Sequence, residues 1–179
     1  MNGGNVIEGP GKSGSSPLSR RVMLATPAHD SRCDVEFAYC LAETVRLCTQ
    51  IGIDARPVFW PGEALVQRAR NELVKIALQH KVDDLIFIDS DQGWRPEWVP
   101  QLLRYPVDCV GGAVVKKDEK AESYNVRAVS LDIPVDPKTG LLIVDGLGTG
   151  FLRLSARAMQ ALWDASEEYR DDAGDVNRW

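Results

Sequence analysis

The chain lacks the features of a membrane, secreted or zinc-binding protein. No apolar run approaches the roughly 20 residues of a membrane-spanning helix, and the N-terminus lacks the apolar core of a signal peptide. The four cysteines form no CxxC pair and show no metal-ligand spacing, so we expect free thiols in a reduced, cytoplasmic protein. Histidine is scarce too, with only His29 and His80.

An excess of basic residues is also missing. Lysine and arginine number 21 against 26 acidic residues, a net charge of −5. This balance argues against sequence-independent binding of nucleic acid by the whole surface. A local basic patch would still allow a nucleic-acid substrate. Residues 1–20 are rich in Gly, Ser and Pro and are predicted to form a disordered tail before a single domain, 21–179.

Strand and helix patterns alternate along this domain. Strands are expected at 22–26, 55–60, 83–91 and 107–117 and just before Ser155. Helices are expected at 34–52, 62–80 and 96–105 and from Ser155 onward, with Ser155 as the cap of the last one. The alternation predicts an α/β fold, a three-layer α/β/α sandwich with a mostly parallel central sheet. Ligands bind such sheets beyond the carboxyl ends of the strands. The loops 27–30 and 89–94 and the segment after Val115 are therefore expected to share one rim.

The motif with the clearest chemistry is Asp89-Ser90-Asp91, which directly follows the apolar run 85–88. Residues two apart in an extended segment point to the same side, so both carboxylates are expected to converge at a strand end. Two hard oxygen donors suit Mg²⁺ or Mn²⁺, especially if a diphosphate completes the shell. So short a motif also fits an ordinary Asx-type turn, and its place on the expected rim is what favours a metal.

With this motif the chain resembles the glycosyltransferases of the GT-A fold, whose Asp-x-Asp signature ends a central strand. The similarity is widest in LIFIDSDQGWRPEWVPQLLRYPVDCVGGAVVKK and includes LVQRARNELVKIAL and GLGTGFLRLSARAMQAL. Within that family the chain looks most like the short glycosyltransferase-like proteins of bacteriophages and their hosts. The resemblance implies a GT-A-like domain, in the cytoplasm of a bacterium or phage-infected cell, that transfers a hexose from a nucleotide-diphosphate sugar.

The resemblance also implies a UDP-sugar as the favoured donor and Mn²⁺ or Mg²⁺ as cofactor. Asp89 and Asp91 would hold the metal between the two phosphates, and Asp89 and Ser90 would border the nucleotide. Thr26, Pro27 and Ala28 would lie under the nucleoside. The acceptor stays open, with a glycan, a protein or modified DNA as the alternatives.

On the predicted helix 62–80, Arg68 and Asn71 lie three apart and therefore share a face. The resemblance places that face toward the nucleotide, where a guanidinium can clamp a phosphate with two hydrogen bonds. Arg70 is expected to point elsewhere. The alternative is that Arg68 and Asn71 are solvated residues of an amphipathic helix.

The segment GLGTGFLRL resembles the part of the family that borders the sugar and the acceptor. Gly148 and Gly150 would let the backbone approach a ligand closely. Asp145, the one carboxylate beside these glycines, is a candidate contact to sugar or acceptor and the only, weak, candidate for a catalytic group. Lys116 and Lys117 could meet phosphate, or simply face solvent.

The chain departs from the GT-A pattern after the glycine segment. Family members continue with a further strand and helix, a carboxylate base and often a histidine that completes the metal shell. Here no histidine follows His80, and the remaining carboxylates include Asp171, Asp172 and Asp175. The domain is therefore expected either to be truncated at its C-terminus or to take its third metal ligand from water or a partner. Two other functions stay open: a catalytically incomplete nucleotide-binding or structural module of the same fold, and a nucleotidyltransferase or phosphate hydrolase. The second is weaker, because LATPAHDSR offers neither a Gly-rich phosphate loop nor a clear aspartyl nucleophile.

Overall fold

The structure is a computed structural model that describes residues 20–115, 123–128, 130, 132–170, 174 and 176–178. The elements follow the order β1 (Arg21–Ala28), α1 (Val35–Gln50), β2 (Asp54–Pro61), α2 (Val66–Gln79), β3 (Asp84–Ile88), α3 (Trp98–Arg104), β4 (Cys109–Gly111), β5 (Val126–Ala128), β6 (Val144–Leu147), β7 (Phe151–Ser155), α4 (Ala156–Ala165), β8 (Glu168–Arg170) and β9 (Val176–Arg178). None of the helices in these ranges is long and apolar enough to cross a membrane. Lys116, Lys117, Asp171, Asp172 and Asp175 lie outside the described residues.

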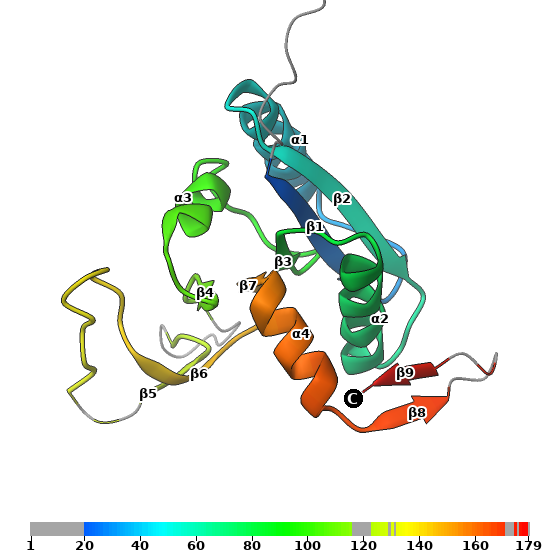
Figure 1. The fold of residues 1–179 in the computed structure, drawn as a ribbon. Helices are drawn as coiled ribbons and strands as arrows, with labels where there is room; N and C mark the ends of the chain where they lie inside the picture. Colours follow the sequence, from blue (N-terminus) through cyan, green and yellow to red (C-terminus); the bar gives the residue numbers. More distant parts are fainter. Residues whose placement is uncertain are drawn as a thin grey trace, which may run out of the picture.

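Five strands form one mixed sheet in the order β2-β1-β3-β7-β4 (Figure 1). Strand β1 pairs in parallel with β2 and β3, whereas β7 runs antiparallel to both β3 and β4. Strands β1 to β4 therefore point the same way, and β7 alone is reversed. The predicted α/β class is confirmed, and the reversal of β7 makes the sheet mixed.

Apolar side chains cover both faces of this sheet. Every residue of β3 is buried, as expected for a central strand without a solvated face. Because neighbouring strand residues alternate in direction, Leu85 and Phe87 belong to one core cluster and Ile86 and Ile88 to another. Helices α2 and α4 contribute to the first cluster, and helices α1 and α3 to the second.

The helix ends follow local sequence signals. Asp34 occupies the N-cap of α1, although its side chain makes no capping hydrogen bond, and Gly52 beyond the C-cap has φ +79°, the left-handed conformation that favours glycine. Ser155 caps α4 as predicted, since its Oγ accepts a hydrogen bond from the amide of Ala158 at 3.1 Å. Helix α2 starts later than expected, at Val66.

A buried ion cluster lies at the amino end of β3. The side chain of Asp84 is fully buried and accepts hydrogen bonds from Nε of Arg20 at 2.5 Å and from Nε of Arg153 at 2.6 Å. The same guanidiniums bind backbone oxygens of α3 and of the segment after it, Leu103 for Arg20 and Val107 for Arg153. Arg20, which the sequence places in the tail, is thus bonded to the central strand.

The last strand packs on the domain. Asn177 in β9 is fully buried and donates a side-chain hydrogen bond to Glu72 of α2. The guanidinium of Arg178 donates to the backbone oxygens of Trp163 and Ser166 at 3.0 and 3.2 Å. The hairpin of β8 and β9 therefore lies against helices α2 and α4 (Figure 1).

Candidate metal and phosphate site

The chain brings Asp89 and Gly150 together at the carboxyl end of β3. Because β7 is antiparallel to β3, Phe151 pairs with Ile88, and the residues just beyond this pair meet. The amide of Asp89 donates to the backbone oxygen of Gly150 at 3.0 Å. Two segments that the sequence singled out separately, 61 residues apart in the chain, therefore form one rim.

The residues after Asp89 form a turn and not the extended segment that was expected. The amide of Gln92 donates to the backbone oxygen of Asp89 at 3.1 Å, so Ser90 and Asp91 are the central turn residues. The backbone oxygen of Ser90 accepts from the amide of Asp34 at 3.0 Å, which ties the turn to the start of α1. The Asp89 and Asp91 carboxylates were expected to converge because residues two apart in a strand point to the same side. That argument was wrong, because the strand ends at Ile88 and a turn follows it.

Arg70 contacts Asp89, which corrects the expectation that it points elsewhere. Its Nη2 lies 2.7 Å from Oδ1 of Asp89, and the two side chains are 18% and 34% exposed. The guanidinium also lies over the ring of Phe87, 5.9 Å from the centroid. Arg68, the predicted phosphate ligand, instead pairs with Glu63 at 3.5 Å, and Asn71 is half-buried.

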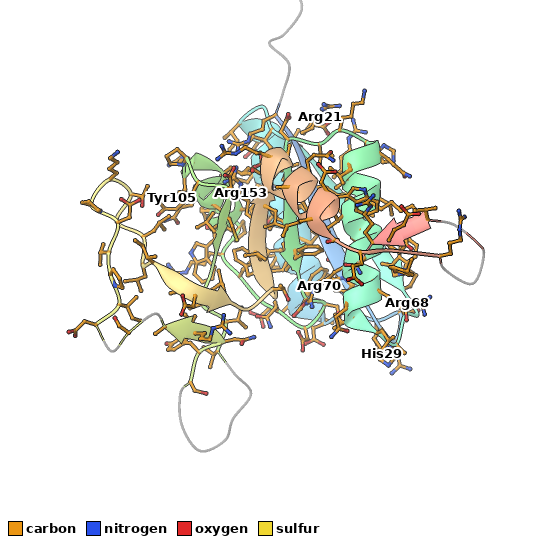
Figure 2. The ribbon with its side chains drawn as sticks, turned by 60° about the horizontal axis from the view of Figure 1, so that its bottom comes forward. Arg21, His29, Arg68, Arg70, Tyr105 and Arg153 are labelled. Atoms are coloured by element: carbon orange, nitrogen blue, oxygen red, sulfur yellow. The ribbon has the colours of Figure 1, made fainter. Side chains whose placement is uncertain are left out.

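Helix geometry explains why Arg70 reaches Asp89. The buried stripe of α2 consists of Ala69, Leu73 and Ala77, and Arg70 flanks that stripe by one residue. A long side chain beside a buried stripe can lie along the protein surface toward a neighbouring strand. Figure 2 shows Arg70, Arg68 and His29 at one end of the molecule and Arg21 and Arg153 toward the other.

The guanidinium of Arg70 is incompletely satisfied. Within the part of the chain that the structure describes, its Nε is the one buried side-chain nitrogen or oxygen without a hydrogen-bond partner. Buried polar groups in native proteins almost always have partners, and a missing partner costs about 1–3 kcal/mol. Arg70 therefore retains donor capacity next to the carboxylate that it neutralises.

Because Gly150 has no side chain, the carboxylate of Asp89 can lie close to its backbone. A Cβ at this position would lie 2.9 Å from Oδ2 of Asp89 and 3.6 Å from Cγ2 of Val114. Any side chain larger than hydrogen would therefore crowd the carboxylate. In the structure the group that lies close to Gly150 is the Asp89 carboxylate, and the expected approach to a ligand stays a prediction.

The other candidate residues of the glycine segment, Asp145 and Gly148, precede Gly150 in the chain and bond to the segment around β5. The amide of Gly148 donates to the backbone oxygen of Asn125 at 2.8 Å, and a Cβ there would meet the Asn125 side chain. Asp145 lies on β6 with an exposed side chain, while its backbone oxygen accepts from Arg127 at 3.1 Å. A surface hollow of about 470 Å³ lies over β5 and β6, lined by Asn125, Val126, Arg127, Gly146 and Leu147.

The end of β1 borders the same rim. Thr26, Pro27 and Ala28 are buried and continue the strand past its predicted end, paired with β2. The backbone oxygen of Ala28 accepts from the amide of Gly62 at 3.1 Å, and Nδ1 of His29 lies 3.1 Å from the backbone oxygen of Glu63. The loops after β1 and β2 therefore hold each other in place.

Sequence reasoning missed one carboxylate at this rim. A Cβ at Gly93 would collide with the carboxylate of Glu36, in the first turn of α1. The one sign of this contact in the sequence is Gly93 itself, two residues after Asp91, because only glycine leaves room there for the Glu36 carboxylate. Trp94 is buried close to this turn, and its indole nitrogen donates to Thr44 at 2.9 Å. Trp98 is 44% exposed and packs edge-on against Phe151.

The donor chemistry of Asp89 and Asp91 suits a hard cation that shares its shell with a ligand. Asp89 and Asp91 offer carboxylate oxygens, the donors that Mg²⁺ and Mn²⁺ prefer, and Gly150 keeps the space beside Oδ2 of Asp89 free of a side chain. Among the described residues, no group of three or more His, Cys, Asp or Glu side chains is arranged to hold a metal. Oxygens of a diphosphate or of water would therefore have to complete the shell.

The fold and this rim define a mixed α/β protein with an Asp-Arg pair at the carboxyl end of its central strand. No protein-family model matches the chain, and no curated protein or solved structure does so either. The resemblance to GT-A glycosyltransferases therefore stays a prediction.

Proposed function

We propose that the protein is a metal-dependent glycosyltransferase with a three-layer GT-A-like fold, which uses a nucleotide-diphosphate sugar, UDP-linked by preference. The observation that carries the proposal is the pair at the end of β3, where Asp89 lies beside Gly150 and 2.7 Å from Arg70. A carboxylate for a cation and a guanidinium for phosphate oxygens then stand side by side, where open α/β sheets bind their ligands.

In this proposal the donor's diphosphate lies over the carboxyl ends of β1 and β3. Asp89 and Asp91 hold Mn²⁺ or Mg²⁺, which supplies Lewis-acid stabilisation of the departing diphosphate when bound. Arg70 donates hydrogen bonds to phosphate oxygens, a role first assigned to Arg68. Thr26, Pro27 and Ala28 support the nucleoside from the end of β1.

The acceptor side is assigned to the glycine segment and β6. Gly148 and Gly150 bring the backbone close to the sugar, and Asp145 is the candidate to orient or deprotonate an acceptor hydroxyl. The hollow over β5 and β6 is open enough to receive part of a glycan, a protein or modified DNA. The acceptor itself is unidentified.

A second candidate is a nucleotide-binding module of the same fold without sugar transfer. One observation favours it: a metal shell built from three or more protein side chains is absent from the described residues. Such a module would bind metal and nucleoside diphosphate at the same rim but release no product.

Release of UDP from UDP-sugars, with Mn²⁺ or with EDTA, separates these candidates. We expect slow metal-dependent release with one or more donors, loss of release in Asp89→Asn, and no change in Asp164→Asn, an exposed carboxylate on α4. Binding of the donor without release of UDP would favour the module. Absence of binding to every nucleotide-sugar tested would overturn both.

A further inference from the structure

Two positively charged groups, Arg70 and a divalent cation, would compete for the carboxylate of Asp89. It is the first candidate ligand for a divalent cation, yet its Oδ1 accepts a hydrogen bond from Arg70 at 2.7 Å. A guanidinium and a divalent cation attract the same carboxylate and repel each other. A cation that arrives alone must therefore displace or tolerate the positive charge of Arg70.

Arg70 is held where it is by few interactions. Its Nη2 binds Asp89 and its face covers Phe87, while its Nε is buried without a partner in the described part of the chain. A diphosphate offers several anionic oxygens, and charge-assisted hydrogen bonds to phosphate are stronger than neutral ones. Turning toward such a ligand would satisfy Nε and release Oδ1 of Asp89.

We propose that Arg70 makes cation binding at Asp89 conditional on a diphosphate, which draws the guanidinium off the carboxylate. This inference rests on the proposed function and adds the coupling between its two ligands. In the ligand-free protein Arg70 occupies the cation's place, and in the complex it binds the phosphate while the cation binds Asp89. Because coupling is reciprocal, the cation also raises the affinity for the diphosphate.

Arg68 supplies a matched control on the same helix. It lies two residues from Arg70, is 31% exposed, and pairs with Glu63 at 3.5 Å. Loss of its charge removes one arginine near the rim without freeing Asp89. Arg68→Gln and Arg70→Gln therefore differ in the contact to Asp89 and not in net charge.

The experiment measures free Mn²⁺ by electron paramagnetic resonance, in titrations with Mn²⁺ alone, and measures UDP binding by calorimetry with and without saturating Mn²⁺. In the wild type and Arg68→Gln we expect weak binding of Mn²⁺ alone and UDP affinity raised about tenfold or more by Mn²⁺, within the usual range of allosteric couplings. Arg70→Gln should bind Mn²⁺ alone about tenfold more tightly, a factor inside the same range, and should lose most of the coupling.

Arg70→Lys keeps the charge but not the planar fork, and it should keep Mn²⁺ alone weakly bound. Far-ultraviolet circular dichroism confirms that each variant is folded. If Arg70→Gln binds Mn²⁺ no more tightly than the wild type, while UDP binding still needs Mn²⁺, the coupling role is overturned and the proposed function stands. If the wild type binds neither Mn²⁺ nor UDP, both are overturned.

Discussion

Strand β3 carries an aspartate at its amino end and another just past its carboxyl end, and their surroundings differ sharply. Asp84 is fully buried and accepts from two arginines, each of which also donates to a backbone oxygen. Asp89 is 34% exposed and accepts from Arg70, whose Nε has no partner among the described residues. Both contacts are Asp-Arg pairs, but only in the first is the carboxylate fully buried.

This difference separates a structural pair from a binding site. A buried ion pair persists only when its donors and acceptors are satisfied, because desolvating the charges is costly. The cluster at Asp84 meets that condition and holds Arg20, α3 and β7 to the central strand. The pair at Asp89 does not meet it among the described residues, because Nε of Arg70 is buried there without a partner, and Asp89 borders solvent, where a ligand can reach its carboxylate.

The largest effect is expected from the loss of Asp84, the buried aspartate at the amino end of β3, on the free energy of unfolding. Asp84→Asn leaves Arg153, only 5% exposed, without a carboxylate, and loss of one partner of a buried pair costs about 3–5 kcal/mol. Urea denaturation should show a loss of that size in the free energy of unfolding. A loss below about 1 kcal/mol, the value of a surface pair, would contradict the assignment of Asp84 as structural.

A smaller effect, on binding, is expected from Gly150→Ala. The added Cβ would lie 2.9 Å from Oδ2 of Asp89 and should displace the carboxylate. We expect UDP affinity in Mn²⁺ to fall about tenfold, which corresponds to about 1.4 kcal/mol. Gly146→Ala is the control, because its Cβ would lie 3.4 Å from the Arg127 side chain. Equal affinities of the two variants in calorimetry would argue against a site at Asp89.

Asp89→Asn tests whether the Asp89 pair, unlike the Asp84 cluster, contributes little to stability. Because Asp89 is one-third exposed and its pair borders solvent, its replacement should change the free energy of unfolding by less than about 1 kcal/mol. The same variant should lose Mn²⁺-dependent UDP binding. A stability loss as large as that of Asp84→Asn would mean that both pairs are structural.

The smallest effect is expected in the acid dependence of stability. Asp108 accepts hydrogen bonds from Arg157 and from Ser155, which lower the pKa of its carboxyl group below the ordinary value, and Arg157 is the larger cause. A lowered pKa in the folded state contributes stability above the unfolded pKa, and this is lost as the pH falls through the folded pKa. Asp108→Asn should therefore flatten the loss of stability below about pH 4, near the ordinary pKa of Asp. An unchanged pH profile in thermal unfolding would contradict this.

Local signals predicted much of the fold. The uniformly apolar run of β3 and the cap at Ser155 both appear where expected, because each depends on neighbouring residues only. The reversal of β7 was not predicted, since strand direction depends on how the chain returns to the sheet. Strand β1 extends to Ala28 because β2 pairs with it there, which the sequence of β1 alone does not contain.

The contacts at the end of β3 were only partly predictable from the sequence. The loop that begins at Asp89 was placed on a ligand rim because parallel strands end at one edge, but its contact with Gly150 was not predicted, since it depends on the reversal of β7. Arg70 was missed because residue spacing on a helix ignores how far a guanidinium reaches. The partners of Asp84 were not predictable, since Arg20 and Arg153 lie 64 and 69 residues away in the sequence.

The central claim is that the carboxyl end of β3 binds a cation and a diphosphate together. Calorimetric titration of UDP into the wild type and Asp91→Ala, with Mn²⁺ and with EDTA, tests it most directly. We predict binding in Mn²⁺ that EDTA abolishes and that Asp91→Ala lacks. Binding that is unchanged by EDTA and by Asp91→Ala, or no binding in any condition, would contradict the claim.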